Sequence, residues 1–293
     1  YKDKVENLAW DQDRISEAVI TAENSDVVIL CVGLDETLEG EEGDTGNSDA
    51  SGDKVDLHLP KVQEELIEKV TAAGKPTIVV LMAGSAIDLN YAQDNCNGIL
   101  LAWYPGARGG RAVADLLFGK ESPSGKLPVT FYKDLEGMPE FTDYSMKNRT
   151  YRYMEKEALY PFGYGLTYSD ACVTGAEVIG EVSAESDITL KATVKNNGTV
   201  DTDEVVQVYI KDLDSPLAVR NYSLCGFKRV SLQAGEEKTV EFTVSNKAMN
   251  VIDEDGNRYI AGKHFRLFAG VSQPDTRSAE LTGHKPVEIE ITL

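Results

Sequence analysis

The densest group of chemically reactive side chains in this sequence lies in an acidic segment, residues 35–53. It reads DETLEGEEGDTGNSDASGD and directly follows an apolar run. Its carboxylates include Glu36, Glu39, Glu41, Glu42 and Asp44. Crowded carboxylates raise one another's pKa by like-charge repulsion. One of them can then keep its proton near neutral pH and act as a general acid.

The same composition fits two interpretations without acid/base chemistry. An acidic run can be only a solvated turn, or it can bind calcium in a metal-dependent adhesion module. The EF-hand spacing D-x-[DN]-x-[DN]-G is not matched. The three histidines, His58, His264 and His284, are scattered along the chain. We therefore expect no zinc site and no histidine-based triad, and neither a metal nor an organic cofactor.

Strand-like and helix-like segments alternate in the first half of the chain. Buried strands are predicted at 27–33, 77–82 and 98–103, where the residues are nearly all apolar. Helices are predicted at 15–24, 60–73 and 111–117, and a short connecting element at 87–92. This order predicts an α/β domain with a mostly parallel sheet and right-handed crossovers. Such sheets bind ligands beyond the carboxyl ends of their strands, which is where the acidic segment begins.

In the second half of the chain, apolar and polar residues alternate with a period of two. Residues 119–168 are rich in proline and glycine and long for a loop, so we expect them to be functional or to wrap another domain. Strands are predicted at 187–195, 204–211, 223–230, 238–244 and 265–270. Strands at this spacing without helices predict an all-β sandwich. The sequence thus predicts two domains, an α/β sandwich at 1–168 and a β-sandwich at 169–293.

Composition narrows the classes of partner. A formal net charge of -20 argues against nucleic acid or an anionic membrane, and no apolar run reaches the ~18 residues of a membrane span. The four cysteines have no C-x-x-C pairing, so we expect buried free thiols. The start at Tyr1 shows no charged-then-apolar leader, and both a cytoplasmic and a secreted location stay open.

Ordered motifs extend along nearly the whole chain. The acidic segment contains Gly33-Leu34, Glu39-Gly40-Glu41-Glu42, Gly52-Asp53 and Leu57-His58-Leu59-Pro60. Further motifs are AWYPGARGG at 102–110, FG at 118–119, PSGKLPVTF at 123–131, TYRY at 150–153 and YPFGYGLTY at 160–168. The second half carries GFKRV at 226–230 and a turn at 235–236. Together these motifs resemble glycoside hydrolase family 3.

The resemblance implies an α/β sandwich domain followed by a fibronectin-III-like (immunoglobulin-like) β-sandwich. It also implies part of a retaining β-glycosidase that hydrolyses terminal β-glucosides or β-xylosides. In that family an Asp nucleophile lies on a (β/α)8-type barrel, and a Glu from the acidic segment is the acid/base. A barrel needs roughly 200 or more residues and does not fit here. We expect it in the same polypeptide or a partner, and we expect this chain alone to be inactive.

The resemblance also selects candidate residues. Glu42 is the first choice for the acid/base, because Glu42-Gly43 precedes Gly52-Asp53 at the spacing that fits the family best. Glu41 and Glu39 are the alternatives. Lys54 stands where the family usually has Arg, which keeps the charge but loses the bidentate fork. The rival function is a non-catalytic carbohydrate-binding or structural module, and no substrate-binding residue is predicted.

Three further residues have predicted structural roles. Trp103 and Tyr104 follow a predicted strand, and we expect them to pack in a core or between domains rather than to stack on a sugar ring. Arg152 lies in the long Pro- and Gly-rich segment. The resemblance implies a structural contact there, at the barrel, rather than a contact with substrate.

Overall fold

The computed structural model describes residues 13–39, 54 and 56–293. The chain forms two compact units. Unit 1 comprises residues 1–113 and 133–135, and unit 2 comprises residues 114–132 and 136–293. The long segment after residue 113 therefore belongs mainly to the second unit.

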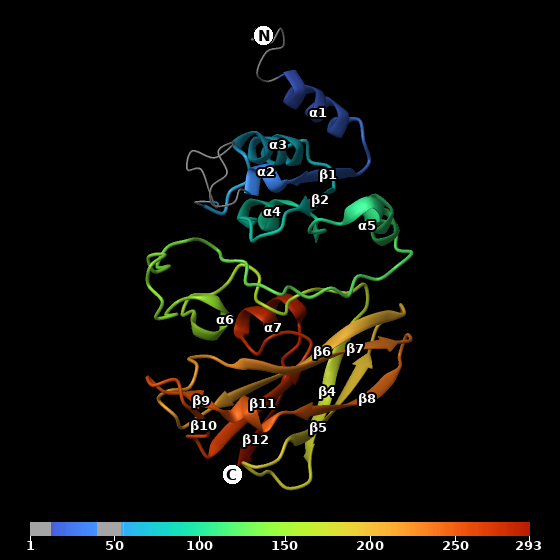
Figure 1. The fold of residues 1–293 in the computed structure, drawn as a ribbon. Helices are drawn as coiled ribbons and strands as arrows, with labels where there is room; N and C mark the ends of the chain where they lie inside the picture. Colours follow the sequence, from blue (N-terminus) through green and yellow to red (C-terminus); the bar gives the residue numbers. More distant parts are fainter. Residues whose placement is uncertain (1–12, 40–53, 55) are drawn as a thin grey trace. The chain divides into compact units, whose positions relative to one another are not determined.

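Unit 1 is an α/β unit built on three parallel strands (Figure 1). The strands are β1 (Val28–Gly33), β2 (Thr77–Met82) and β3 (Gly98–Leu101), in the order β1-β2-β3. The helices are α1 (Asp13–Glu23), α2 (Glu36–Glu39), α3 (Lys61–Thr71), α4 (Asn90–Asn95), η1 (Gly106–Arg108) and α5 (Gly109–Leu117), whose last residues lie in unit 2. The predicted parallel α/β sheet is confirmed.

The edge strand β1 is less buried than its apolar sequence predicts. Ile29 is 45% exposed and Cys31 is exposed, whereas Val79 and Leu81 in the central strand β2 are fully buried. All four cysteines are free, but none is fully buried, so the prediction of buried thiols is wrong. An apolar run alone does not tell an edge strand from a central one, and Cys31 lies on the edge.

Unit 2 contains a sandwich of two antiparallel sheets (Figure 1). One sheet has the order β4-β5-β8, with β4 (Ala171–Ile179), β5 (Ile188–Asn196) and β8 (Glu237–Val244). The other has the order β12-β11-β6-β7, with β6 (Thr202–Asp212), β7 (Ser223–Leu232), β11 (His264–Gly270) and β12 (Val287–Thr292). Smaller elements are β9 (Val251–Ile252), β10 (Arg258–Tyr259), η2 (Asn246–Met249), α6 (Thr150–Tyr153) and α7 (Thr276–Thr282).

Alternating side chains of the two sheets form the core of the sandwich. Leu190 and Val194 of β5, Val206 and Val208 of β6, and Phe265 of β11 are all fully buried. This alternation is the signal from which a sandwich was predicted, and the prediction is confirmed. The helix α7 was not predicted.

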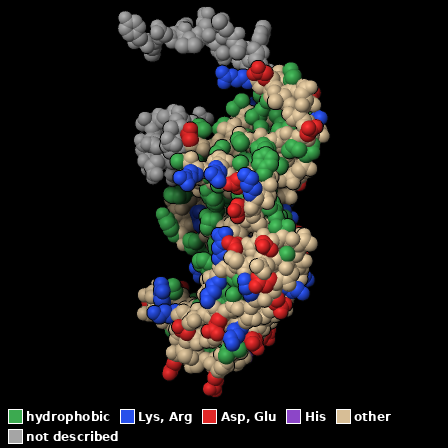
Figure 2. Space-filling view, turned by 90° about the vertical axis from the view of Figure 1, so that its right-hand side faces the viewer, with side chains coloured by type: hydrophobic (Ala, Val, Ile, Leu, Met, Phe, Trp, Pro, Cys, Tyr) green, Lys and Arg blue, Asp and Glu red, His purple; other side chains and the backbone are tan. Residues whose placement is uncertain are grey.

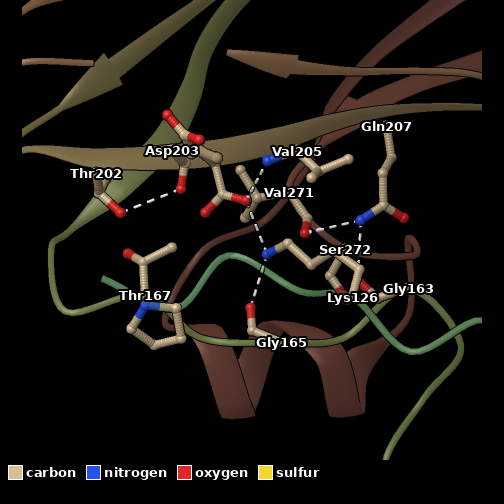
Figure 3. A network of polar contacts seen from close by, with 12 residues as sticks. Lys126, Gly163, Gly165, Thr167, Thr202, Asp203, Val205, Gln207, Val271 and Ser272 are labelled. Carbon is tan, nitrogen blue, oxygen red and sulfur yellow. Dashed lines mark hydrogen bonds and ion pairs between the residues drawn. The ribbon is translucent and has the colours of Figure 1, made fainter. Parts of the chain in front are cut away.

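An ion pair joins the long segment to the sandwich within unit 2. Lys126 Nζ lies 2.8 Å from Glu204 Oε1 of β6, and the two side chains are only 8% and 4% exposed. Lys126 also donates to the Gly165 carbonyl at 2.7 Å (Figure 3). Ser122 and Thr202 share a hydrogen bond of 2.7 Å. These contacts agree with the second of the two roles predicted for this segment, that it wraps another domain; the first, a functional role, stays a prediction.

Aromatic rings also join the long segment to the sandwich. Tyr151 stacks on Phe162 at a centroid distance of 4.3 Å and meets Tyr209 of β6 edge to face at 6.2 Å. The Tyr222 ring lies 5.6 Å from that of Tyr209. Next to them Arg152 Nε donates to Ser223 Oγ at 3.1 Å. Arg152 thus makes a structural contact, here with β7 of the sandwich; the expected contact with a barrel stays a prediction.

The surface carries charges of both signs. On the face shown in Figure 2, acidic and basic side chains are interspersed rather than gathered into one patch. Within the described part of the chain, no helix is long and apolar enough to cross a membrane.

Candidate functional site

The acidic segment begins where β1 meets the end of β2. Leu34 N donates to Met82 O at 2.8 Å. A Cβ on Gly33 would lie 1.8 Å from that same Met82 oxygen, so only glycine allows this approach. Asp35 then caps α2, because its Oδ1 accepts a hydrogen bond from Leu38 N at 3.1 Å.

A glutamine from α3 holds the same corner. Gln63 Nε2 donates to Gly33 O and Gln63 Oε1 accepts from Gly33 N, both at 2.8 Å. The amide thereby satisfies both backbone groups at the end of the edge strand. The predicted helix at 60–73 therefore also fixes the direction in which the chain leaves β1.

Glu39, the last residue of α2, contacts the loops that follow β2 and β3. Its Oε1 accepts from Ser85 Oγ at 2.5 Å, and its Oε2 accepts from Tyr104 Oη at 2.6 Å. Gly84 N donates to both oxygens, at 3.1 and 3.2 Å. Donors from two strand ends therefore converge on one carboxylate at the carboxyl edge of the sheet.

Tyr104 reaches this carboxylate from a strained turn. Trp103, directly before it, has φ 52°, a left-handed conformation that bulky side chains rarely adopt. Burial and the hydrogen bond to Glu39 raise the pKa of Tyr104 to about 12, so it remains a phenol and a donor at neutral pH. Tyr104 was expected to pack in a core or between domains; instead its hydroxyl donates to an acidic side chain.

Electrostatics keep Glu39 ionised. Burial by itself raises the pKa of Glu39, but the hydrogen bonds from Ser85, Tyr104 and Gly84 outweigh it. Together with the positive charge of Lys54 they hold the pKa below its ordinary value of 4.5. Lys54 Nζ donates to Ala86 O at 3.2 Å, and its burial lowers the pKa of the ammonium.

The predicted acid/base residues divide between described and undescribed parts of the chain. Glu39 is described, whereas Glu42 and Glu41 lie outside the described residues. Within the residues that the structure describes, no three His, Cys, Asp or Glu side chains gather in a way that could hold a metal ion.

The contacts of Glu39 with Ser85 and Tyr104 were not predicted from the sequence. A usable signal was present, because Gly84-Ser85 comes just after β2 and Tyr104 comes just after β3. Parallel strands end at one edge of the sheet, so polar residues that follow them meet there.

Comparison with protein families gives two matches. Residues 2–168 match the model of the glycosyl hydrolase family 3 C-terminal domain, and residues 204–273 match the fibronectin type III-like domain. The two matches come in the order that the motifs predicted.

Individual relatives agree with these matches. The chain is 40% identical over 270 residues to a xylan 1,4-beta-xylosidase of Xylanibacter ruminicola, which covers 91% of this chain and 31% of that protein. A Bifidobacterium adolescentis GH3 beta-glucosidase structure superposes with a TM-score of 0.81 at 30% identity, covering 97% of this chain and 41% of that one. For a beta-glucosidase from Erythrobacter marinus the TM-score is 0.80 at 33% identity, with 95% and 36% covered. The chain thus spans about a third of the length of these relatives.

Proposed function

This chain belongs to glycoside hydrolase family 3, and on that premise we propose that it is part of a retaining β-glycosidase acting on terminal β-glucosides or β-xylosides. Its contribution is the segment that carries the acid/base glutamate. The described residues form three parallel strands and a β-sandwich, so the nucleophile would come from a barrel outside this chain.

The chemistry requires two carboxyl groups on opposite sides of the sugar. One attacks the anomeric carbon, and the other protonates the leaving oxygen and then activates water. In retaining enzymes they lie about 5 to 5.5 Å apart. Glu42 is our first candidate for the second carboxyl group, with Glu41 and Glu39 as the alternatives.

The observation that carries the proposal is the position of the acidic segment. Its described start, residues 35–39, leaves the sheet at the carboxyl end of β1, beside the loops that follow β2 and β3. Open α/β sheets present their working groups at this edge. This position supports the proposal that a carboxyl group of the acidic segment is the acid/base for a substrate held by the barrel.

The test is hydrolysis of an aryl β-glucoside and an aryl β-xyloside. We compare this chain alone with a longer polypeptide that adds the barrel, as wild type and as the Glu42→Gln and Glu41→Gln variants. The expected result is an inactive chain, an active longer polypeptide and one variant that loses about 10²- to 10⁴-fold in kcat, the usual contribution of a general acid.

Two results would refute the proposal. Activity of the chain alone would place a nucleophile within these residues. A longer polypeptide that binds sugars but hydrolyses neither glycoside would support the rival, non-catalytic function.

A further inference from the structure

The contacts of Glu39 separate it from the other carboxyl groups of the acidic segment. Its two oxygens accept hydrogen bonds from Ser85, Tyr104 and Gly84 N, all within 3.2 Å. A proton on Glu39 would break or reverse at least one of these bonds, since a protonated oxygen no longer accepts along that direction. Hydrogen bonds to the charged form also favour that form.

The space around the carboxylate fits this arrangement closely. A Cβ on Gly84 would lie 2.6 Å from Glu39 Oε2 and 2.8 Å from Tyr104 Cε2. The absence of a side chain at Gly84 therefore lets the backbone N–H reach the carboxylate. A carboxylate that only faced solvent would need no such close fit.

A proton donor needs different surroundings. A general acid works best when its pKa lies near the operating pH, so a glutamate in that role must have its pKa raised. In Glu39 the hydrogen bonds act in the opposite direction and lower the pKa. Its side chain is therefore suited to fixing the chain rather than to passing on a proton.

We propose that Glu39 is a positioning residue: its carboxylate, held by Gly84, Ser85 and Tyr104, fixes the start of the acidic segment at the ends of β2 and β3, and a different carboxyl group donates the proton. This inference rests on the proposed function. Two or three residues of chain span at most roughly 7 to 11 Å, so fixing Glu39 limits where Glu41 and Glu42 can lie.

The first test uses this chain without any activity. Glutamate labelled with 13C at the side-chain carboxyl is titrated by NMR, and the Glu39 signal is the one missing from Glu39→Gln. We expect its midpoint below 4.5 in the wild type and a higher midpoint in Ser85→Ala. A wild-type midpoint at or above 4.5, or one that Ser85→Ala leaves unchanged, overturns the contact role.

The second test uses the longer polypeptide with glycosides of good and poor leaving groups, with and without azide. A misplaced acid/base carboxyl group protonates the leaving oxygen less well, so Glu39→Gln should lose about 10- to 100-fold, the cost of a misplacement near 1 Å, and more with the poor leaving group. Azide should not restore activity. The true acid/base variant, Glu42→Gln or Glu41→Gln, should lose most with the poor leaving group and regain activity with azide, giving a glycosyl azide.

The outcomes separate the two proposals. Azide rescue of Glu39→Gln, with formation of the glycosyl azide, would make Glu39 the proton donor and overturn the inference, while the glycosidase function stands. A wild-type polypeptide that hydrolyses no glycoside would overturn both the proposed function and the role in catalysis, and the titration would still decide whether Glu39 is held as described.

Discussion

Replacing Lys126 by Met removes one partner of the buried ion pair that joins the long segment to β6. The ammonium lies 2.8 Å from the Glu204 carboxylate, and both side chains are at most 8% exposed. Met keeps most of the volume and the apolar stem but leaves the carboxylate without its counter-charge. Glu204 retains the hydrogen bond from Val205 N at 2.6 Å, which does not neutralise it.

The expected loss of unfolding free energy in unit 2 is about 3 to 5 kcal/mol at neutral pH, the usual cost of breaking a buried pair from one side. The double variant Lys126→Met with Glu204→Gln should recover at least half of it, since no buried charge then remains. Lys120→Met is the matched control. Lys120 pairs with Asp115 at 3.1 Å but is 70% exposed, so it should cost less than about 1 kcal/mol.

The loss should depend on pH in a defined direction. Burial raises the pKa of Glu204, and the charge of Lys126 opposes this rise. A carboxyl group whose folded pKa lies above its unfolded pKa favours folding as the pH falls through the folded value. Without Lys126 the folded pKa rises further, so the destabilisation of Lys126→Met should be largest near pH 8 and shrink toward pH 5.

The assay must report on unit 2 alone. Both tryptophans, Trp10 and Trp103, precede residue 114, so unit 2 contains no tryptophan and needs a different probe. Pulsed hydrogen exchange on peptides from β6, read by mass spectrometry along a urea series, follows the sandwich. A change below 1 kcal/mol in Lys126→Met, or a loss that grows as the pH falls, would refute the reasoning.

Three further predictions concern other contacts. Gly84→Ala should displace Glu39 and so lower the urea midpoint of unit 1, measured by tryptophan fluorescence. Gly110→Ala is the control, because a Cβ there meets nothing within 4 Å, and it should leave the midpoint unchanged. Equal midpoints for the two variants would contradict the close fit at Gly84. The hydrogen bond that His58 Nδ1 donates to the Glu64 carboxylate raises the pKa of His58, so its stabilisation is present below the unfolded pKa of about 6.5 and lost above the folded one. His58→Gln should therefore lower the free energy of unfolding by at most about 1 kcal/mol at pH 6, because the site is exposed. The thermal midpoint should fall slightly at pH 6 and stay unchanged at pH 9. A fragment of residues 169–293, which begins at the predicted domain boundary, should have a lower urea midpoint than a fragment of residues 114–293. The shorter fragment lacks the buried Lys126 and the stacked rings of Tyr151 and Phe162. Similar midpoints would show that the long segment adds no stability.

Much of the fold followed from local patterns in the sequence. The strand at 77–82 was predicted with its observed bounds, because a run of β-branched and apolar residues between Pro76 and a glycine has few other solutions. The helix α7 was missed because seven residues are too few to show a period, although Asp275 Oδ1 caps it by accepting a hydrogen bond from Ser278 N. In β4, a bulge between Val173 and Gly175 breaks the alternation that marks a strand.

The site was only partly predictable. The acidic segment stood out because its composition is local, and the resemblance named its carboxyl groups. The contacts of Glu39 with Ser85 and Tyr104 join residues 46 and 65 positions apart. Such contacts depend on which strand ends lie next to each other in the sheet. Patterns in a single sequence predict where the strands are but not their order in the sheet.

The distance along the chain between the long segment and its partners affects synthesis on the ribosome. Ser122 and Thr202 are 80 residues apart, and the buried pair spans a similar stretch. At 5 to 20 residues per second, the segment waits roughly 4 to 16 s for β6 to be made. During that time its aromatic rings have no sandwich to bury them. Apolar surface that is exposed in this way is what holding chaperones bind, and slower translation across residues 170–200 would lengthen that exposure.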